Sequence, residues 1–212
     1  MTVHLPEDSD GAAIKSDMRV LHDELLTRCH DFVANRPRKL ILKCFGLSEK
    51  AVDTVKRFSL EDLLPLLHTP VLLFRPTVDF VSLAEVLAQE DPIHLPDGLI
   101  SSFDQADLPQ EYIRLHSLYF LTIRSISREM DRVTASFFSG LTPKEIDVVR
   151  LAPSPLILKA IQSYVTFFQP RVDFSFISKT ANRNLSPTRI INEAVAAILA
   201  AETSVEQLKK YR

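Results

Sequence analysis

The chain has 212 residues, of which 46% are hydrophobic and 25% are charged, and its formal net charge is −2. This composition is typical of a globular protein with one large domain or two domains of about 100 residues each. No apolar stretch in the chain approaches the length of roughly 20 residues that a helix needs to cross a bilayer. The acidic N-terminus does not resemble a secretory signal. We therefore expect a cytoplasmic protein that has no membrane contact.

The first predicted elements are helical. Apolar periodicity indicates a long amphipathic helix over 14–44, which ends at Gly46, because glycine adopts the left-handed conformation at a helix C-terminus. Ser48 is placed to cap a second, short helix. After a break at 59–60, leucines indicate another short helix, and Pro76 ends the series in an extended segment.

A strongly acidic segment follows. Residues 81–112 contain seven Asp or Glu residues and no Lys or Arg. We interpret 84–110 as a solvated acidic connector between two more basic helical units.

The second half repeats the pattern of the first half. A helix is predicted over 111–138, and Gly140 lies at its end. Thr142, Pro143 and Glu145 form a capping box that begins a short helix, and an apolar helix and an extended segment at Pro170 follow. An alanine-rich final helix is predicted from 188 to about 211.

The two series are related by a shift of 94 positions. Residues 46–80 align without a gap on 140–174, and about a third of these positions are identical. Both copies end in Val-Asp-Phe, at 78–80 and 172–174. We infer an internal duplication, with a first repeat at 14–83 and a second repeat, including the final helix, at 111–212.

No arrangement of residues indicates catalysis. The chain has only four glycines and contains no phosphate-binding loop, and its histidines and its two cysteines lack metal-ligand spacing. His22 and His116 are repeat equivalents, which favours a packing or capping role. Cys29 and His30 are neighbours that point in different directions on a helix. We therefore expect no enzyme activity, no cofactor and no metal.

Basic residues are the remaining candidates for a site, because Lys and Arg bind the phosphates of DNA irrespective of its sequence. Arg124, Arg128 and Arg132 recur every four residues, which predicts one common helix face. A solvated surface with partial neutralisation is the alternative explanation for each cluster. The candidate DNA-binding residues are Arg36, Arg38, Lys39, Lys43, Lys56, Arg57, Arg124, Arg128, Arg132, Arg171, Lys179, Arg183 and Arg189.

The order of these elements resembles the FlhD family, the smaller subunits of the bacterial flagellar master regulator. The segments that carry the resemblance are IRLHSLYFLTIRSIS, ASFFSGLTPKEIDVV and LILKAIQSYVTFFQPRVDFS, followed by the helix after Ser186. It covers 111–203, and more weakly 21–83. The resemblance implies an all-α fold in which two tandem FlhD-like units form an intramolecular pseudo-dimer, with short extended segments after Pro76 and Pro170.

The resemblance also implies a function. FlhD proteins activate transcription on promoter DNA together with FlhC, a zinc-containing partner, and distant relatives control conjugative transfer. We therefore expect a subunit of a DNA-binding activator that works with a FlhC-like partner on transfer or motility genes, and a homo-oligomer fits this scheme. The alternative is a helical adaptor or anti-activator that binds a regulatory protein without contacting DNA.

Overall fold

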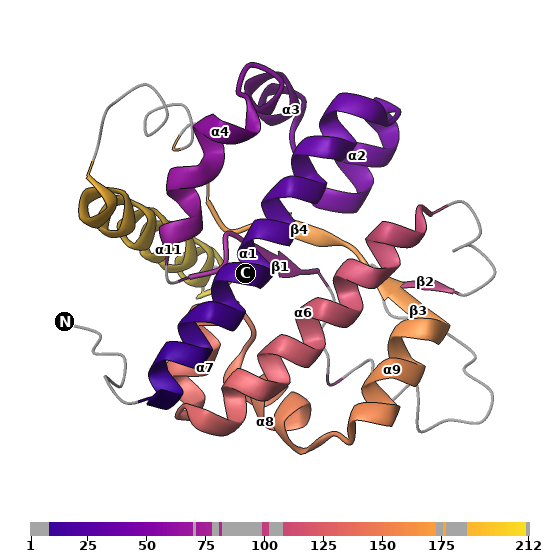
Figure 1. Cartoon of the computed structure of the whole chain (residues 1–212), viewed down its shortest axis with the longest axis vertical. Coiled ribbons are helices and arrows are strands. Elements are labelled where there is room, and N and C mark those ends of the chain that lie inside the picture. Colours follow the sequence, from indigo (N-terminus) through magenta and orange to yellow (C-terminus); the bar gives the residue numbers. More distant parts are fainter. Residues whose placement is uncertain are drawn as a thin grey trace. The chain divides into compact units, whose positions relative to one another are not determined.

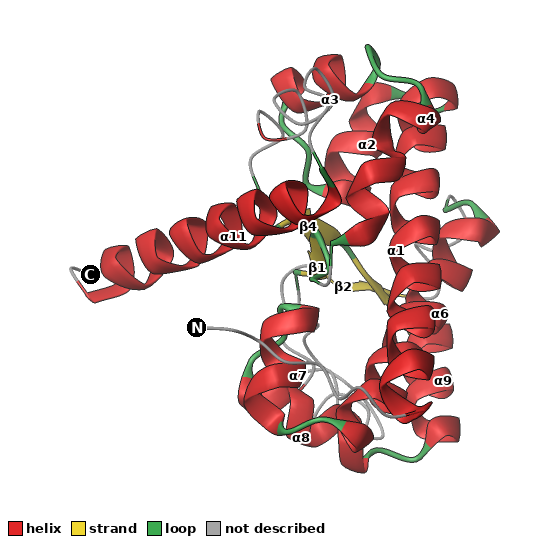
Figure 2. Cartoon of the chain, turned by 60° about the vertical axis from the view of Figure 1, so that its left-hand side comes forward, coloured by secondary structure: helices red, strands yellow, loops and turns green. Residues whose placement is uncertain are grey.

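A computed structural model describes residues 9–69, 71–77, 81, 99–101, 108–172, 176 and 186–210. The structure is mainly helical, with short strands (Figures 1 and 2). None of the helices in this described part is long and apolar enough to span a membrane. Most of the acidic connector lies outside the described residues.

The predicted helices and extended segments occur in order, and a strand at 99–101 lies within 84–110, where no element was predicted. The first repeat contains α1 (Ser9–Asn35), α2 (Arg38–Phe45), α3 (Glu49–Val55), α4 (Leu60–Leu63), the 3₁₀ helix η1 (Leu64–His68) and β1 (Phe74–Pro76). The second contains α6 (Gln110–Glu129), α7 (Arg132–Ser139), α8 (Pro143–Leu151), α9 (Ser154–Ser163), β3 (Tyr164–Thr166), β4 (Phe168–Pro170) and α11 (Pro187–Lys210), and β2 (Leu99–Ser101) precedes it.

The boundaries of these elements agree with the 94-residue alignment. The helices α1 and α6 end at equivalent residues, Asn35 and Glu129, and α2 and α7 have equivalent first and last residues. The helix pairs α3/α8 and α4/α9 begin at equivalent positions, and β1 and β4 coincide. Aligned sequences therefore begin most of their helices at the same positions, although 64–68 form a 3₁₀ helix where the aligned 158–162 continue α9.

Each predicted long helix is broken in two, which corrects the expected spans of 14–44 and 111–138. In the first repeat, Pro37 separates α1 from α2, because proline has no N–H to continue a helix. In the second repeat, Met130 is extended, and the Asp131 carboxylate accepts from the backbone N–H groups of Val133 and Thr134. An N-cap therefore starts a new helix where periodicity predicted continuation.

The predicted caps are confirmed. Gly46 and Gly140 follow α2 and α7 in the left-handed conformation, with φ of 57° and 79°. The Ser48 hydroxyl accepts from the Ala51 N–H at 3.2 Å, and Thr142 and Glu145 form a reciprocal capping box. These interactions satisfy backbone donors that a helix leaves without partners at its N-terminus.

The chain forms two compact units, which do not coincide with the two repeats. One unit combines Met1–Glu24 with Val78–Thr166, and the other combines Leu25–Thr77 with Phe167–Arg212. The helix α1 contributes residues to both units.

The first unit has a core along α6. Tyr112, Tyr119 and Phe120 are fully buried. The Tyr112 hydroxyl donates to the Thr166 carbonyl at 3.3 Å, and the Tyr119 hydroxyl donates to the Ser139 carbonyl at 3.0 Å. Buried tyrosines thus keep partners for their polar atoms. In the same unit, β2 pairs with β3 in antiparallel register.

The second unit has an aromatic core beside a two-stranded sheet. The Phe45 ring packs edge-on against Phe32 and Phe74, with ring centroids 5.3 and 5.8 Å apart, and stacks on Phe168 at 6.4 Å. The strands β1 and β4 pair in antiparallel register in this unit. The extended segments were predicted to follow Pro76 and Pro170, whereas both strands end at these prolines.

Candidate nucleic-acid interface

Among the described residues, a group of exposed cationic side chains lies on α2, on α3 and on the turn after α3. Lys39 and Lys43 project from α2, Lys50 projects from α3, and Lys56 and Arg57 follow α3. All five side chains are exposed. Including Arg36 and Arg38, residues 36–62 carry seven cationic and four anionic side chains, an excess of three positive charges.

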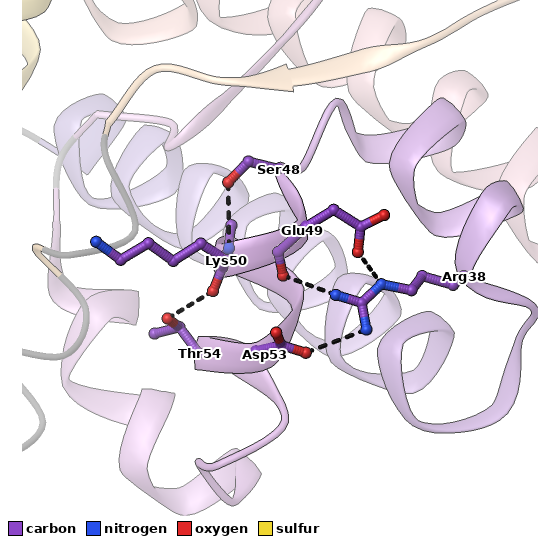
Figure 3. A network of polar contacts seen from close by, with 7 residues as sticks. Arg38, Ser48, Glu49, Lys50, Asp53 and Thr54 are labelled. Carbon is purple, nitrogen blue, oxygen red and sulfur yellow. Dashed lines mark hydrogen bonds and ion pairs between the residues drawn. The ribbon is translucent and has the colours of Figure 1, made fainter.

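Arg38 joins the two helices that carry this surface (Figure 3). Its guanidinium donates to the Glu49 carboxylate and to the Glu49 carbonyl, and it pairs with Asp53 at 3.2 Å. The hydrogen bond that Arg38 donates to Asp53 is the main cause that raises the pKa of Arg38, with Glu49 adding to it. Because two carboxylates compensate its charge, Arg38 serves to hold α2 against α3 and adds little to the excess of positive charge.

Two further cations rest on aromatic rings. The Arg36 guanidinium lies 5.9 Å from the centre of the Phe32 ring, and the Lys43 ammonium lies 5.2 Å from the centre of the Phe167 ring. Such contacts hold a cation by its attraction to the ring face while the charge stays near water. The surface therefore contains both fixed and free cationic side chains.

Three of the four anionic residues on this segment have partners other than the lysines, and the fourth, Glu61, is exposed. Glu49 and Asp53 bind Arg38. The Asp62 carboxylate accepts from the Ser59 hydroxyl and from the Ser59 N–H, both at 2.8 Å, and these bonds lower the pKa of Asp62. Lys39 on α2 and Lys50 on α3 therefore keep exposed charges that a polyanion would meet.

The arginines of the second repeat do not form one cationic stripe. The predicted common face of Arg124, Arg128 and Arg132 is wrong, because α6 ends at Glu129 and Arg132 lies on α7. Arg124 donates to the Ala152 carbonyl at 2.7 Å, and Arg132 pairs with Asp147 at 3.2 Å. Of these three candidates, only Arg128 is exposed and makes no side-chain hydrogen bond or ion pair within the described residues.

The last four candidates differ in their surroundings. Arg171 is 5% exposed, and its guanidinium donates to the Leu72 carbonyl at 3.2 Å, so it belongs to the packed interior and to no exposed surface. Arg189 is exposed and pairs with Glu193 one helical turn away. Lys179 and Arg183 lie outside the described residues.

The histidines and cysteines have structural surroundings. His22 and His116 are both buried, as their predicted packing role requires. Burial raises the pKa of the Cys29 thiol, which disfavours the reactive thiolate, and the neighbouring His30 binds the Phe58 carbonyl at 3.0 Å. No three His, Cys, Asp or Glu side chains gather into a metal site within the residues that the structure describes.

Sequence reasoning missed Lys50, although its identity with Lys144 was visible in the alignment. In the structure Glu49 and Asp53 pair with Arg38, and Lys50 is exposed without a side-chain partner in the described part of the chain.

No protein-family model, curated protein sequence or solved structure matches this chain. Its function is therefore inferred from the geometry of the described residues.

Proposed function

We propose that this chain is a DNA-binding subunit of a transcriptional activator and that it works together with a FlhC-like, zinc-containing partner. The observation that carries the proposal is the exposed cationic surface on α2, α3 and the following turn. The proposed targets are promoters of transfer or motility genes.

The charge distribution supports binding to phosphates. Lys39, Lys56 and Arg57 are exposed cations that belong to one segment of one compact unit. Each such cation that neutralises a phosphate releases counterions, so it adds affinity that falls as the salt concentration rises. Contacts of this kind position a protein on DNA but do not read its sequence. We therefore propose that the complex of this chain with its partner, and not this chain alone, selects the promoter.

The pairing of β1 with β4 supports a fused pseudo-dimer. Phe74 pairs with Pro170 and Pro76 pairs with Phe168, so the two repeat-equivalent strands are antiparallel. Their middle residues are repeat equivalents that lie opposite each other. Two copies of one unit that meet through the same surface produce this arrangement, as in a two-fold symmetric dimer. We propose that this one polypeptide contains both units of an FlhD-like dimer.

The test compares two variants with equal changes in net charge. One carries Lys39→Glu, Lys56→Glu and Arg57→Glu, and the control carries Arg19→Glu, Lys144→Glu and Lys159→Glu, all at exposed positions. Fluorescence anisotropy with a mixed-sequence duplex should show at least a tenfold loss of affinity for the first variant. The slope of the logarithm of the binding constant against the logarithm of the salt concentration should also be smaller in magnitude by about three for this variant.

The control variant should stay within about threefold of the unmodified chain, and circular dichroism should show that both variants are folded. Equal losses in the two variants, or no DNA binding by the unmodified chain at low salt, would overturn the proposal.

A helical adaptor that binds a regulatory protein is the second candidate function. It is favoured by two large apolar side chains on exposed positions of the second repeat, Val133 at 66% and Leu151 at 78% exposure. For an adaptor that never touches DNA, the charge reversals above would leave function in cells intact, whereas polar substitutions at Val133 and Leu151 would abolish it.

A further inference from the structure

Lys50 and Arg38 are both placed to pair with Asp53. Lys50 lies three residues before Asp53 on α3, a spacing at which two side chains of a helix are neighbours. Arg38 reaches the same carboxylate from α2, at 3.2 Å. The structure pairs Asp53 with Arg38, whereas Lys50 is exposed and has no side-chain partner among the described residues. Arg38 therefore binds the carboxylate that Lys50 would otherwise meet.

The charged side chains of α3 point in two directions (Figure 3). Glu49 and Asp53, which are the two acids of this helix, point toward Arg38. The Lys50 side chain extends away from Arg38. Its positive charge is thus directed away from both carboxylates, as contact with an external anion requires.

The Arg38 guanidinium uses all three of its nitrogens in these contacts. Nε donates to the Glu49 carboxylate, Nη2 donates to the Glu49 carbonyl at 3.1 Å, and Nη1 pairs with Asp53. The planar fork of an arginine suits several acceptors at once, whereas a lysine carries the same charge on one compact ammonium. Arg38→Lys therefore conserves the charge but cannot hold the same three acceptors.

The second repeat contains the same ion pair without the cationic surroundings. Arg132 pairs with Asp147 at 3.2 Å, which is also the distance in the Arg38 pair. Residues 130–156, which are equivalent to 36–62, carry three cationic and three anionic side chains in place of seven and four. Arg132 therefore provides a control for the loss of this ion pair outside the cationic surface.

We infer that Arg38 is a positioning residue of the cationic surface and that it acts through Lys50. By holding Glu49 and Asp53, it leaves the Lys50 ammonium free to bind a phosphate of DNA. That the bound anion is DNA rests on the proposed function. Without Arg38, Asp53 pairs with Lys50 along the helix, and the surface loses a salt-dependent phosphate contact that Arg38 itself does not make.

The test uses substitutions that separate charge from geometry. The variants are Arg38→Lys, Lys50→Gln, the combination of both, and the matched control Arg132→Lys. Binding to a mixed-sequence duplex is measured by fluorescence anisotropy over a range of salt concentrations. All variants should be folded by circular dichroism, because exposed ion pairs contribute little to stability.

Arg38→Lys should lower DNA affinity about fivefold at low salt, although the net charge is unchanged. The slope of the logarithm of the binding constant against the logarithm of the salt concentration should be smaller in magnitude by about one. Lys50→Gln should have the same two effects, and the combined variant should be no weaker than about twofold below either single variant, because both substitutions remove one contact. Arg132→Lys should stay within about twofold of the unmodified chain.

Three results would overturn the inference. Unchanged affinity and slope in Arg38→Lys would show that only the charge of this residue matters. Additive losses in the combined variant would show that Arg38 acts independently of Lys50. An equal loss in Arg132→Lys would show that breaking the ion pair in either repeat acts through the stability of the fold.

A measurement without DNA separates this inference from the proposed function. Lysine acylation, followed by mass spectrometry, should label Lys50 at least twofold more slowly in Arg38→Lys than in the unmodified chain, with Lys39 as the internal reference. Adding Asp53→Asn should restore the rate, because the carboxylate that protects the amine is then absent. If the unmodified chain bound no duplex, the proposed function would fail. An unchanged labelling rate of Lys50 would instead refute the role of Arg38.

Discussion

Arg75 and Gln169 lie opposite each other at the centre of the β1–β4 pair, and they are equivalent residues of the two repeats. The same relation continues beyond the strands. The Thr77 N–H donates to the Phe167 carbonyl and the Arg171 N–H donates to the Leu73 carbonyl, both at 2.8 Å. Exchanging the repeats converts one of these bonds into the other, so the local symmetry is two-fold.

Amide hydrogen exchange tests this symmetry. Because both N–H groups bind equivalent carbonyls, the amides of Thr77 and Arg171 should exchange slowly, with protection factors within about tenfold of each other. The amide of Lys144 provides a fast reference, since it lies in the first turn of α8, where no preceding carbonyl of the helix is available. Exchange of either amide as fast as the reference would contradict the pairing.

Gly46 should tolerate no side chain. Its φ is +57°, and an added Cβ would lie 3.1 Å from the Phe168 carbonyl oxygen and 3.2 Å from the Gln169 Cα. Gly46→Ala should lower the free energy of unfolding by about 2 kcal/mol, because the left-handed backbone and the close approach of β4 both penalise a Cβ. Urea denaturation measures this loss. Lys50→Ala, on an exposed position nearby, should change stability by less than about 0.5 kcal/mol.

The capping box of α8 should contribute measurably to stability. The Thr142 hydroxyl accepts from the Glu145 N–H at 3.3 Å, and the Glu145 carboxylate accepts from the Thr142 N–H at 2.6 Å. Thr142→Ala should cost about 1 kcal/mol in thermal or urea unfolding, because it leaves a backbone donor without its partner. Thr142→Ser keeps the hydroxyl and should recover most of the loss. If the serine variant were as unstable as the alanine variant, the hydroxyl would not act as the cap.

Stability should fall as the solution is acidified below neutral pH. Burial lowers the pKa of His116 to about 4, although its Nδ1–H donates to the Tyr112 carbonyl, an interaction that raises the pKa. The unfolded chain, with a histidine pKa near 6.5, binds a proton in the range between these values while the folded chain does not. This group should therefore remove about 2 kcal/mol of stability between pH 7 and pH 5 and have little effect above pH 7.

The matched variant for this measurement is His116→Gln, which does not titrate in this range. Between pH 7 and pH 5, its free energy of unfolding should fall by about 2 kcal/mol less than that of the unmodified chain. The same pH dependence in both proteins would show that other groups cause the acid sensitivity.

The local structure of this protein could be predicted from the sequence. Glycine at 46 and 140, the capping residues and the apolar spacing specify where most helices begin and end, because these signals act within a few residues of the chain. The repeat was visible for the same reason, since identical local signals recur at a fixed distance. The breaks at Pro37 and Asp131 were also present in the sequence but were outweighed by continuous apolar periodicity.

The tertiary structure alone decided which distant residues meet. It paired β1 with β4 across more than 90 positions, and it buried Arg171 against the Leu72 carbonyl, while Lys39 stayed exposed. Charge alone could not separate these two cations, because the charge of a side chain is the same whether the fold buries or exposes it. Burial and pairing depend on contacts between segments far apart in the chain, and the sequence pattern of either segment alone does not contain them.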